Sequence, residues 1–427
     1  GWIGVNWLPE ETLDHITNLR NLKIALSGLT ALIGLLIAFL FQQFRNKLTK
    51  RIRTMPTDLL VSRSVGIVLG LIIATDSDLN LEYFKAGDTL VSGPATGVTT
   101  MTYTGSGQGA SMTGVGFAPD LVWIKSRNND QVDHVWGDII RGPNNSISSN
   151  LSEPSNTVGG RINSFDGDGW SMGANQAVND SGGSFVAWLF DAGSANAAQN
   201  TDGSINSLVK ANPTTGFSIA QFSSKDNGSV GHGLGTLPAF IIYKNYDSDQ
   251  SWRVYHKDVG VGNTMYLDRQ DGATADLDRV TGIDSDKFTL GQTIENEDYI
   301  AYSWKEVPGV SKFGGYTGVN GGPLTIDCGF KPGILIIKCS SDGGFNWLII
   351  DNQRPNEANG VSQKLYPGTR SNTNGMQRGD ETKVNFTDTG FEILDNGAES
   401  NSSTRTYIYA AWAAEEIIAT VVEDADV

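Results

Sequence analysis

The sequence has few of the residues on which metal sites and disulfide frameworks are built. It contains two cysteines and four histidines among its 427 residues. Two cysteines, Cys328 and Cys339, cannot form a disulfide framework, so we expect packed or free thiols. The histidines show neither the HxxxH nor the HExxH spacing typical of zinc sites. A structural or catalytic zinc ion is therefore not expected.

Positive charge is also scarce. Lys and Arg number 31 against 47 Asp and Glu, which gives a formal net charge of −16. No nucleic-acid partner is predicted, because neutralising phosphates takes clustered Lys and Arg. Neither a G-x-S-x-G elbow nor a P-loop occurs, and no spacing singles out a pair of carboxylates at glycosidase distance. A non-enzymatic protein is the expectation, and a polysaccharide-degrading enzyme is the weakest alternative.

Long apolar runs are missing from most of the chain, but one lies near its start. Residues 24–41, IALSGLTALIGLLIAFLF, have two polar interruptions and about the length of a membrane-crossing helix. The basic stretch QQFRNKLTKRIR follows and would face the cytoplasm. Residues 1–74 are therefore predicted to form an apolar helical attachment segment. Whether 24–41 spans a membrane or is buried in an assembly stays open.

From about residue 75 the sequence is rich in turn-forming residues, including many of its 51 glycines, and it repeats itself. An opening motif occurs as GFAPDLVWIK (116–125), TLPAFIIYK (236–244) and GFKPGILIIK (329–338). In each copy a proline stands six residues before a lysine, with an apolar run between them. Three occurrences in one register indicate internal repeats. The lysines (Lys125, Lys244 and Lys338) are expected where the strand emerges into solvent.

Further landmarks follow each opening motif in the same order. A polar loop ends at Trp136, Trp252 or Trp347, and a closing aromatic strand carries Trp188, Trp304 or Trp412. Between loop and closing strand lies a turn with an aromatic residue: FDGDGWSMG, IDSDKFTLG or FTDTGFEIL. These landmarks divide the chain into a β linker (75–105) and three repeats (106–200, 201–309 and 310–427).

Each repeat has the size and the short, turn-bounded strands of an antiparallel β-sandwich. The predicted fold is therefore mainly β: tandem sandwich repeats of jelly-roll or concanavalin-like type after the N-terminal helical segment. The continuously apolar opening strand is expected to be buried on both faces, as a central strand would be. The recurring tryptophans are expected to pack within the core of their own repeat.

The combination GFAPDLVWIKSRNN, VWGDIIRGPNN, SFDGDGWSMG and GGSFVAWLF resembles the repeated β-sandwich domain of tail-fibre-like proteins from tailed, especially marine, bacteriophages. The resemblance is clearest over 106–192, and the second and third copies lack the Arg-Gly pair found at 141–142. It implies a virion structural or host-attachment protein in the tail or fibre, without a cofactor. The implied partners are further copies of the chain (a trimer, for example), other virion proteins and a host-surface glycan.

A membrane-anchored bacterial surface adhesin, with an extracellular location, is the alternative that the apolar segment 24–41 and its basic flank favour. The candidate ligand-binding residues are the same in either case, because recognition usually lies on loops carried by a rigid sandwich. They are polar residues of the loops after the three opening strands: Asn128, Asn129 and Asp130, then Asn245, Tyr246 and Asp247, then Asp342 and Asn346.

Calcium is the one cofactor left open. DGDGW (166–170) and DSDLNLE (76–82) resemble the openings of calcium-binding loops. Neither places a glutamate at the twelfth position, where Ala177 and Gly87 stand instead. An Asp-Gly turn between two strands explains 166–170 better, because its counterparts in the other repeats keep the turn and vary the acids.

Overall fold

The structure is a computed structural model that describes residues 96–413, except for 277–278, 294–295, 320–321, 356–361, 369–383 and 395–396. Residues 93–415 form one compact unit. Its described secondary structure is strand except for one four-residue helix, and every pair of named strands is antiparallel, so the predicted fold class is confirmed. The predicted segment 1–74, including 24–41, and the DSDLNLE stretch lie outside the described residues. Within those residues no helix is long and apolar enough to cross a membrane.

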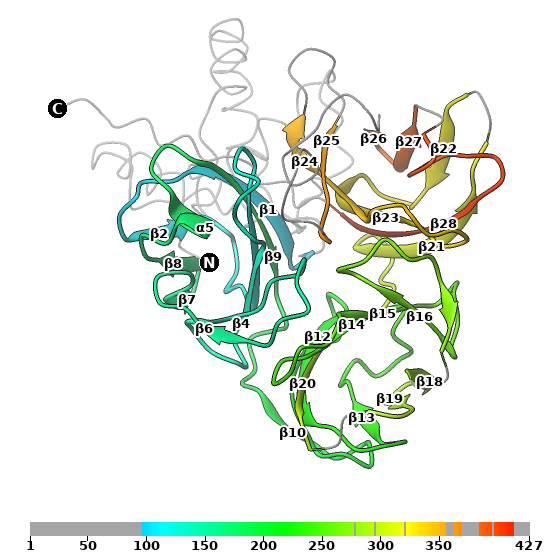
Figure 1. Ribbon diagram of the computed structural model, residues 1–427, viewed down its shortest axis with the longest axis horizontal. Helices are drawn as coiled ribbons and strands as arrows, with labels where there is room; N and C mark the ends of the chain where they lie inside the picture. The colour runs from blue at the N-terminus through cyan, green and yellow to red at the C-terminus, as the bar shows by residue number, and fades with distance from the viewer. Residues whose placement is uncertain are drawn as a thin grey trace, which may run out of the picture. The chain divides into compact units, whose positions relative to one another are not determined.

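The first repeat is a four-stranded sheet faced by a three-stranded one, with a two-stranded ladder and the short helix α5 (Gln176–Asn179) beside them. Its first strand pairs with its last along the whole length, so the repeat closes on itself (Figure 1). The sheets, in spatial order, are β1 (Val98–Thr104), β9 (Ser184–Phe190), β3 (Leu121–Ser126) and β4 (Val135–Asp138); then β2 (Ala110–Thr113), β8 (Gly169–Met172) and β7 (Ser164–Asp166); then β5 (Asn145–Ser146) and β6 (Asn156–Thr157).

The second repeat has the same strand order, but a hairpin extends its larger sheet at each edge. The eight strands of that sheet are β10 (Ala198–Asn200), β11 (Ser207–Asn212), β12 (Phe217–Ser223), β20 (Asp298–Trp304), β14 (Phe240–Asn245), β15 (Arg253–His256), β16 (Asn263–Tyr266) and β17 (Thr274–Ala275). The smaller sheet is β13 (Ser229–Gly231), β19 (Lys287–Leu290) and β18 (Val280–Ile283).

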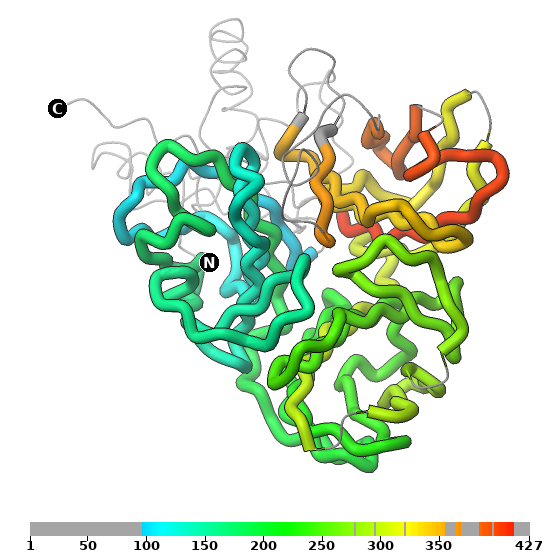
Figure 2. The backbone as a smooth tube through the Cα atoms, viewed as in Figure 1, coloured from blue at the N-terminus to red at the C-terminus, as the bar shows by residue number. Residues whose placement is uncertain are grey.

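In the third repeat the two sheets are continuous, because β25 and β26 pair. The order is β21 (Ser311–Thr317), β28 (Thr406–Ala413), β23 (Pro332–Cys339), β24 (Leu348–Pro355), β25 (Ser362–Leu365), β26 (Val384–Thr387), β27 (Gly390–Ile393) and β22 (Leu324–Asp327). The colours of Figure 2 follow the chain from the first repeat (cyan to green) through the second (green) to the third (yellow to red).

Two of the predicted boundaries need adjustment. Strand β1 lies in the predicted linker 75–105, yet all seven of its residues pair with β9, so it belongs to the first repeat. The predicted boundary at 200 and 201 falls within the β10–β11 hairpin, which extends the sheet of the second repeat through β12. The first repeat therefore includes Val98, and the second includes Ala198.

The opening strands are buried on both faces, as predicted, and the structure shows why. Side chains alternate between the two faces of a strand. On β3, Val122 and Ile124 lie in a core confined to the first repeat, whereas Leu121 and Trp123 lie in a core shared by all three repeats. The central strands β14 and β23 likewise place alternate side chains in a local core and in the shared core. Each repeat thus has a local core and contributes to a shared core.

The shared core corrects the expectation that each closing tryptophan packs within its own repeat. Trp188, Trp304 and Trp412 all belong to the shared cluster. The ring centroids of Trp304 and Trp412, from the second and third repeats, are 5.6 Å apart. Those of Trp136 and Trp252, from the first and second, are 5.1 Å apart. The two cysteines are buried and unbonded, as predicted.

Candidate functional site: the loops and the joints between repeats

The loop of the first repeat holds its own shape through its candidate residues. Asn128 is exposed, and its Oδ1 accepts from the backbone N–H of Ser184 at 3.1 Å. Asn129 is half-buried and its Oδ1 accepts from the N–H of Gln131 at 2.8 Å. Asp130, also half-buried, accepts from the side chain of Gln131 at 2.7 Å. Of the three, Asn128 offers the most accessible polar group.

In the second repeat, Asn245 is buried, and its Oδ1 accepts from the N–H groups of Asp247 and Ser248 at 3.0 Å each. Tyr246 is half-buried against the shared core, and burial raises the pKa of its hydroxyl to about 12. Asp247 is exposed and accepts from the N–H of Asp298 at 2.6 Å. Asn245 therefore shapes the loop, and Asp247 lies at its surface.

The third loop also has one exposed and one buried candidate residue. Asp342 is exposed and pairs with Arg405, with 3.2 Å between its Oδ2 and the arginine Nε. Asn346 is only 6% exposed. Its Oδ1 accepts from Gln270 Nε2 of the second repeat at 3.0 Å. The eight candidate residues thus lie in three separate loops, each with its own hydrogen-bond partners.

The sequence suggested that the lysines that close the opening motifs emerge into solvent. This prediction is wrong. Lys125, Lys244 and Lys338 are fully buried and donate to backbone carbonyls. Lys244 Nζ reaches the carbonyl of Ser152 in the first repeat at 3.0 Å, and Lys338 Nζ reaches that of Gln270 in the second at 3.1 Å. Burial lowers the pKa of each of the three lysines to about 8. Two of them therefore join neighbouring repeats.

The strand register also changes which residues are equivalent. Ile124 pairs with Val135, so Lys125 faces His134 at the next position along. By the same count Lys244 faces Trp252 and Lys338 faces Trp347. The counterpart of Trp252 and Trp347 is therefore His134, and Trp136 corresponds to Val254 and Ile349. The sequence comparison aligned the tryptophans, but the first repeat has a histidine at this register position and its tryptophan two residues later.

These three equivalent side chains form a closed ring of contacts between repeats. Trp252 Nε1 donates to the carbonyl of Ser148 in the first repeat at 2.9 Å. Trp347 Nε1 donates to the carbonyl of Tyr266 in the second repeat at 2.8 Å. His134 Nε2 lies 3.2 Å from the carbonyl of Tyr366 in the third repeat. Each repeat thus contacts the one before it, and the first contacts the third, so the arrangement has pseudo-threefold symmetry.

A second ring of buried polar groups surrounds the shared core. Asp138 pairs with Arg141 at 2.6 Å and accepts from the Tyr302 hydroxyl of the second repeat at 2.7 Å. Asp351 pairs with Arg354 at 2.7 Å and accepts from Trp188 Nε1 of the first repeat at 2.9 Å. The third repeat therefore keeps the arginine although it lacks the Arg-Gly pair. The repeated Asp-x-x-Arg spacing was the sequence signal that could have revealed this.

The second repeat fills the equivalent position with His256 instead of an aspartate. Its Nδ1 lies 3.2 Å from the N–H of Asp258 and its Nε2 lies 3.1 Å from the carbonyl of Tyr409 in the third repeat. Nδ1 is therefore the acceptor and Nε2 the protonated donor. Burial lowers the pKa of His256 to about 4, which keeps the ring neutral near pH 7.

Comparison with known proteins places this unit in a family. A family model described as a domain of unknown function, DUF7483, matches residues 94–416. The chain belongs to the DUF7483 family. A different model, the YCF81 N-terminal domain, matches residues 1–75. An uncharacterised PIN- and TRAM-domain-containing protein of Synechocystis is 34% identical over 74 residues, which cover 17% of this chain and 21% of that protein.

The calcium alternative finds no support at 166–170 of the DUF7483 region. The Asp168 carboxylate accepts from the N–H groups of Gly114 and Gly116, at 2.9 and 2.7 Å, and so joins two turns. Among the residues that the structure describes, no group of three or more His, Cys, Asp or Glu side chains is placed to hold a metal ion.

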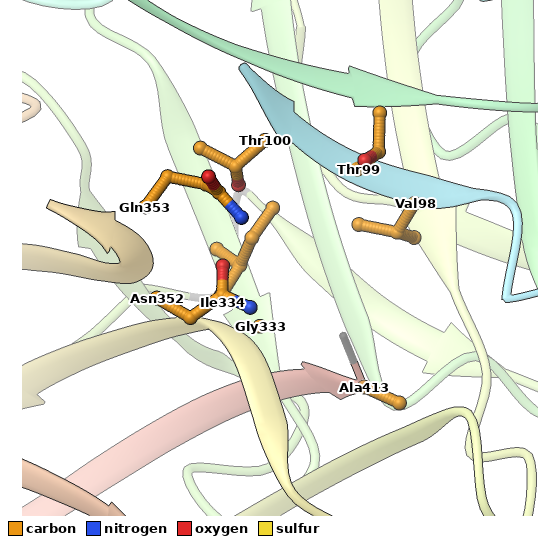
Figure 3. A pocket seen from close by; sticks show the side chains of 8 residues that line it. All are labelled: Val98, Thr99, Thr100, Gly333, Ile334, Asn352, Gln353 and Ala413. Carbon is orange, nitrogen blue, oxygen red and sulfur yellow. The ribbon is translucent and has the colours of Figure 1, made fainter. Parts of the chain in front are cut away.

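A small pocket lies where the first repeat meets the third. Figure 3 shows Thr99, Thr100 and Val98 of β1 on one side and residues of the third repeat on the other (Gly333, Ile334, Asn352, Gln353 and Ala413). Its cavity volume is about 10 Å³, which is about the room that a single water molecule needs. This pocket is too small for a sugar or a cofactor.

Proposed function

We propose that the chain is a non-enzymatic, tail-fibre-like structural protein of a tailed-phage virion that attaches to host-surface glycans. The observation that carries the proposal is the shared core. Three sandwiches that bury one apolar cluster together make a stiff support, and a stiff support is what surface loops need in order to recognise a partner. The sequence resemblance over 106–192 supplies the virion context.

The accessible loop residues have specific roles in this proposal. Asn128, Asp247 and Asp342 present amide and carboxylate groups at the surface, and such groups hydrogen-bond sugar hydroxyls. The half-buried residues Asn129, Asp130 and Tyr246 shape the loop surface, and the buried Asn245 and Asn346 hold the loops in place. The expected partners are further copies of this chain, other virion proteins and a host glycan. No cofactor or nucleic acid is needed.

Electron microscopy with an antibody against residues 94–416 tests the proposal directly. Labelling of tails or fibres on virions is the expected result. Labelling of cell envelopes in uninfected cells would overturn it and favour the adhesin. A glycan array adds the binding test: the triple variant Asn128→Ala, Asp247→Ala, Asp342→Ala should lose binding while its unfolding transition stays unchanged. Release of reducing ends from a bound glycan would instead indicate an enzyme.

A membrane-anchored bacterial surface adhesin is the second candidate. The apolar segment 24–41 and the basic stretch that follows it favour this candidate. If 24–41 is a membrane helix, Leu35→Lys should cost about 3 kcal/mol on insertion scales and release the protein from membranes. If the segment is buried in an assembly, the same change should abolish oligomers whether or not lipid is present.

A further inference from the structure

A buried amine, a buried amide and a carboxylate meet in the third repeat. Glu399 Oε2 accepts from Lys364 Nζ at 3.0 Å and from the Tyr366 hydroxyl at 3.2 Å. Its other oxygen, Oε1, accepts from Asn346 Nδ2 at 3.4 Å. The side chain of Lys364 is 1% exposed and that of Glu399 is 24% exposed. One carboxylate thus bridges a lysine and an asparagine that are both nearly closed to solvent.

The enclosure of this cluster argues against an external ligand. Lys364, Asn346 and Tyr366 are all buried, so a substrate would have no face of the amine or amide to approach. Glu399 contacts the amine with one carboxylate oxygen and the amide with the other. Such an arrangement suits a reaction between the side chains themselves, because one carboxylate orients both groups and their burial excludes competing water. Gln270 Nε2 donates to Asn346 Oδ1 at 3.0 Å. That N–H would stabilise negative charge developing on the amide oxygen.

We propose that Lys364 and Asn346 become joined by an intramolecular amide bond, with Glu399 as the catalytic acid and base. Glu399 takes a proton from the Lys364 ammonium, and the neutral Nζ attacks Cγ of Asn346. Glu399 then returns a proton to Nδ2 while it takes one from the attacking nitrogen. The Cγ–Nδ2 bond breaks, and ammonia leaves. In sum, an ammonium group and a primary amide give a secondary amide and an ammonium ion, with no oxidant or other reactant.

The bond would tie the residue before Trp347 to β25, so it would lock the β24–β25 hairpin beside the joint with the second repeat. Trp347 makes one of the contacts that close the ring between repeats. The inference does not depend on the proposed virion function, because it follows from the side chains alone. A cross-link at this position would hold the third repeat against mechanical pulling, whatever surface carries the protein.

Intact mass spectrometry of the purified full chain under denaturing conditions tests the proposal. The expected mass is that of the sequence less one ammonia, and digestion should give a branched peptide joining Asn346 to Lys364. A chain at the full sequence mass would overturn the proposal. So would a mass deficit without the branched peptide, because cyclisation of Asn346 onto its own backbone also releases ammonia.

Variants separate catalysis from folding. Glu399→Gln should have its full sequence mass, because no group remains to move the protons. Asn346→Asp should still form the bond but lose water in place of ammonia, so it remains informative if Glu399→Gln does not fold. An Asn346→Asp chain at full mass would contradict the proposal. Lys312→Met, at a side chain 43% exposed on β21, is the matched control and should keep the ammonia deficit.

Discussion

The shared core and the three local cores are built from the same strands but have different consequences. A local core is lined by the two sheets of one repeat, as around Trp170 in the first repeat. The shared core takes the opposite face of the central strands and exists only when all three repeats are together. Damage to a local core should therefore stay local, whereas damage to the shared core should spread through the whole unit.

The largest loss of stability is expected from matched tryptophan substitutions in the shared core and in a local core. Trp188 is fully buried in the shared core and Trp170 is fully buried in a local one. Either change to alanine should cost about 4 kcal/mol, as large-to-small core changes do. Hydrogen exchange followed by mass spectrometry should show faster exchange in all three repeats for Trp188→Ala. For Trp170→Ala the increase should be confined to the first repeat.

A Trp188→Ala variant that exchanges faster only within residues 96–192 would show that the repeats are energetically independent. The sequence-based prediction that each repeat is stabilised by its own core would then be correct. Trp304→Ala and Trp412→Ala extend the test, since both residues lie in the shared core and should behave like Trp188→Ala.

The next effect concerns the buried charges around the shared core. Asp351→Asn would leave Arg354, whose side chain is fully buried, without its carboxylate partner. Breaking a buried ion pair on one side costs about 3 kcal/mol or more, because the remaining charge is uncompensated. Urea denaturation should show this loss for Asp351→Asn. The double variant Asp351→Leu, Arg354→Met should recover part of it; a double variant less stable than the single one would contradict the explanation.

Acid should lower the stability of the folded unit through His256, which belongs to the ring of buried polar groups around the shared core. The pKa of His256 is lowered to about 4 in the folded state by burial, against about 6.5 in an unfolded chain. Between these values the unfolded state binds more protons, so stability is full above pH 6.5 and falls as the pH drops toward 4, by at most about 3 kcal/mol. His256→Gln should show a shallower decline, measured as the urea midpoint against pH.

The contribution of Asp120 to stability changes with pH in the opposite direction, so Asp120 serves as a control. Burial raises its pKa to about 6, although the nearby Lys210 ammonium opposes this shift. Its contribution is therefore complete below pH 3.8 and is lost as the pH rises through 6. Asp120→Asn should steepen the net fall in stability toward acid. An unchanged profile in both variants would mean that neither group titrates in this range.

The smallest effect is expected at the loop tips. Asn128→Ala removes an exposed side chain whose hydrogen bond to the Ser184 N–H spans the surface. Surface changes of this kind usually alter stability by no more than about 0.5 kcal/mol. Asn245→Ala, at a fully buried loop residue, should cost about 1–3 kcal/mol because it leaves two N–H groups without their acceptor. Thermal unfolding of both variants compares them directly.

The sequence by itself determined the class of fold and the number of repeats. The opening strands are apolar at every position, and such runs with turn residues around them predict central strands. The order of four landmarks located the three repeats. The sequence could show this repetition because each landmark depends on local turn and strand chemistry.

The tertiary structure decided what each face of those strands contacts. An apolar run shows that both faces are buried, but Trp123 and Val122 look equally suited to any core, and only the packing assigns one to the shared core and the other to the first repeat. Lys244 has the sequence context of a surface residue. It can be buried because a carbonyl from a distant part of the chain, that of Ser152 in the first repeat, accepts from its ammonium group. Such partners are set by contacts between segments that the chain brings together, which a local pattern does not encode.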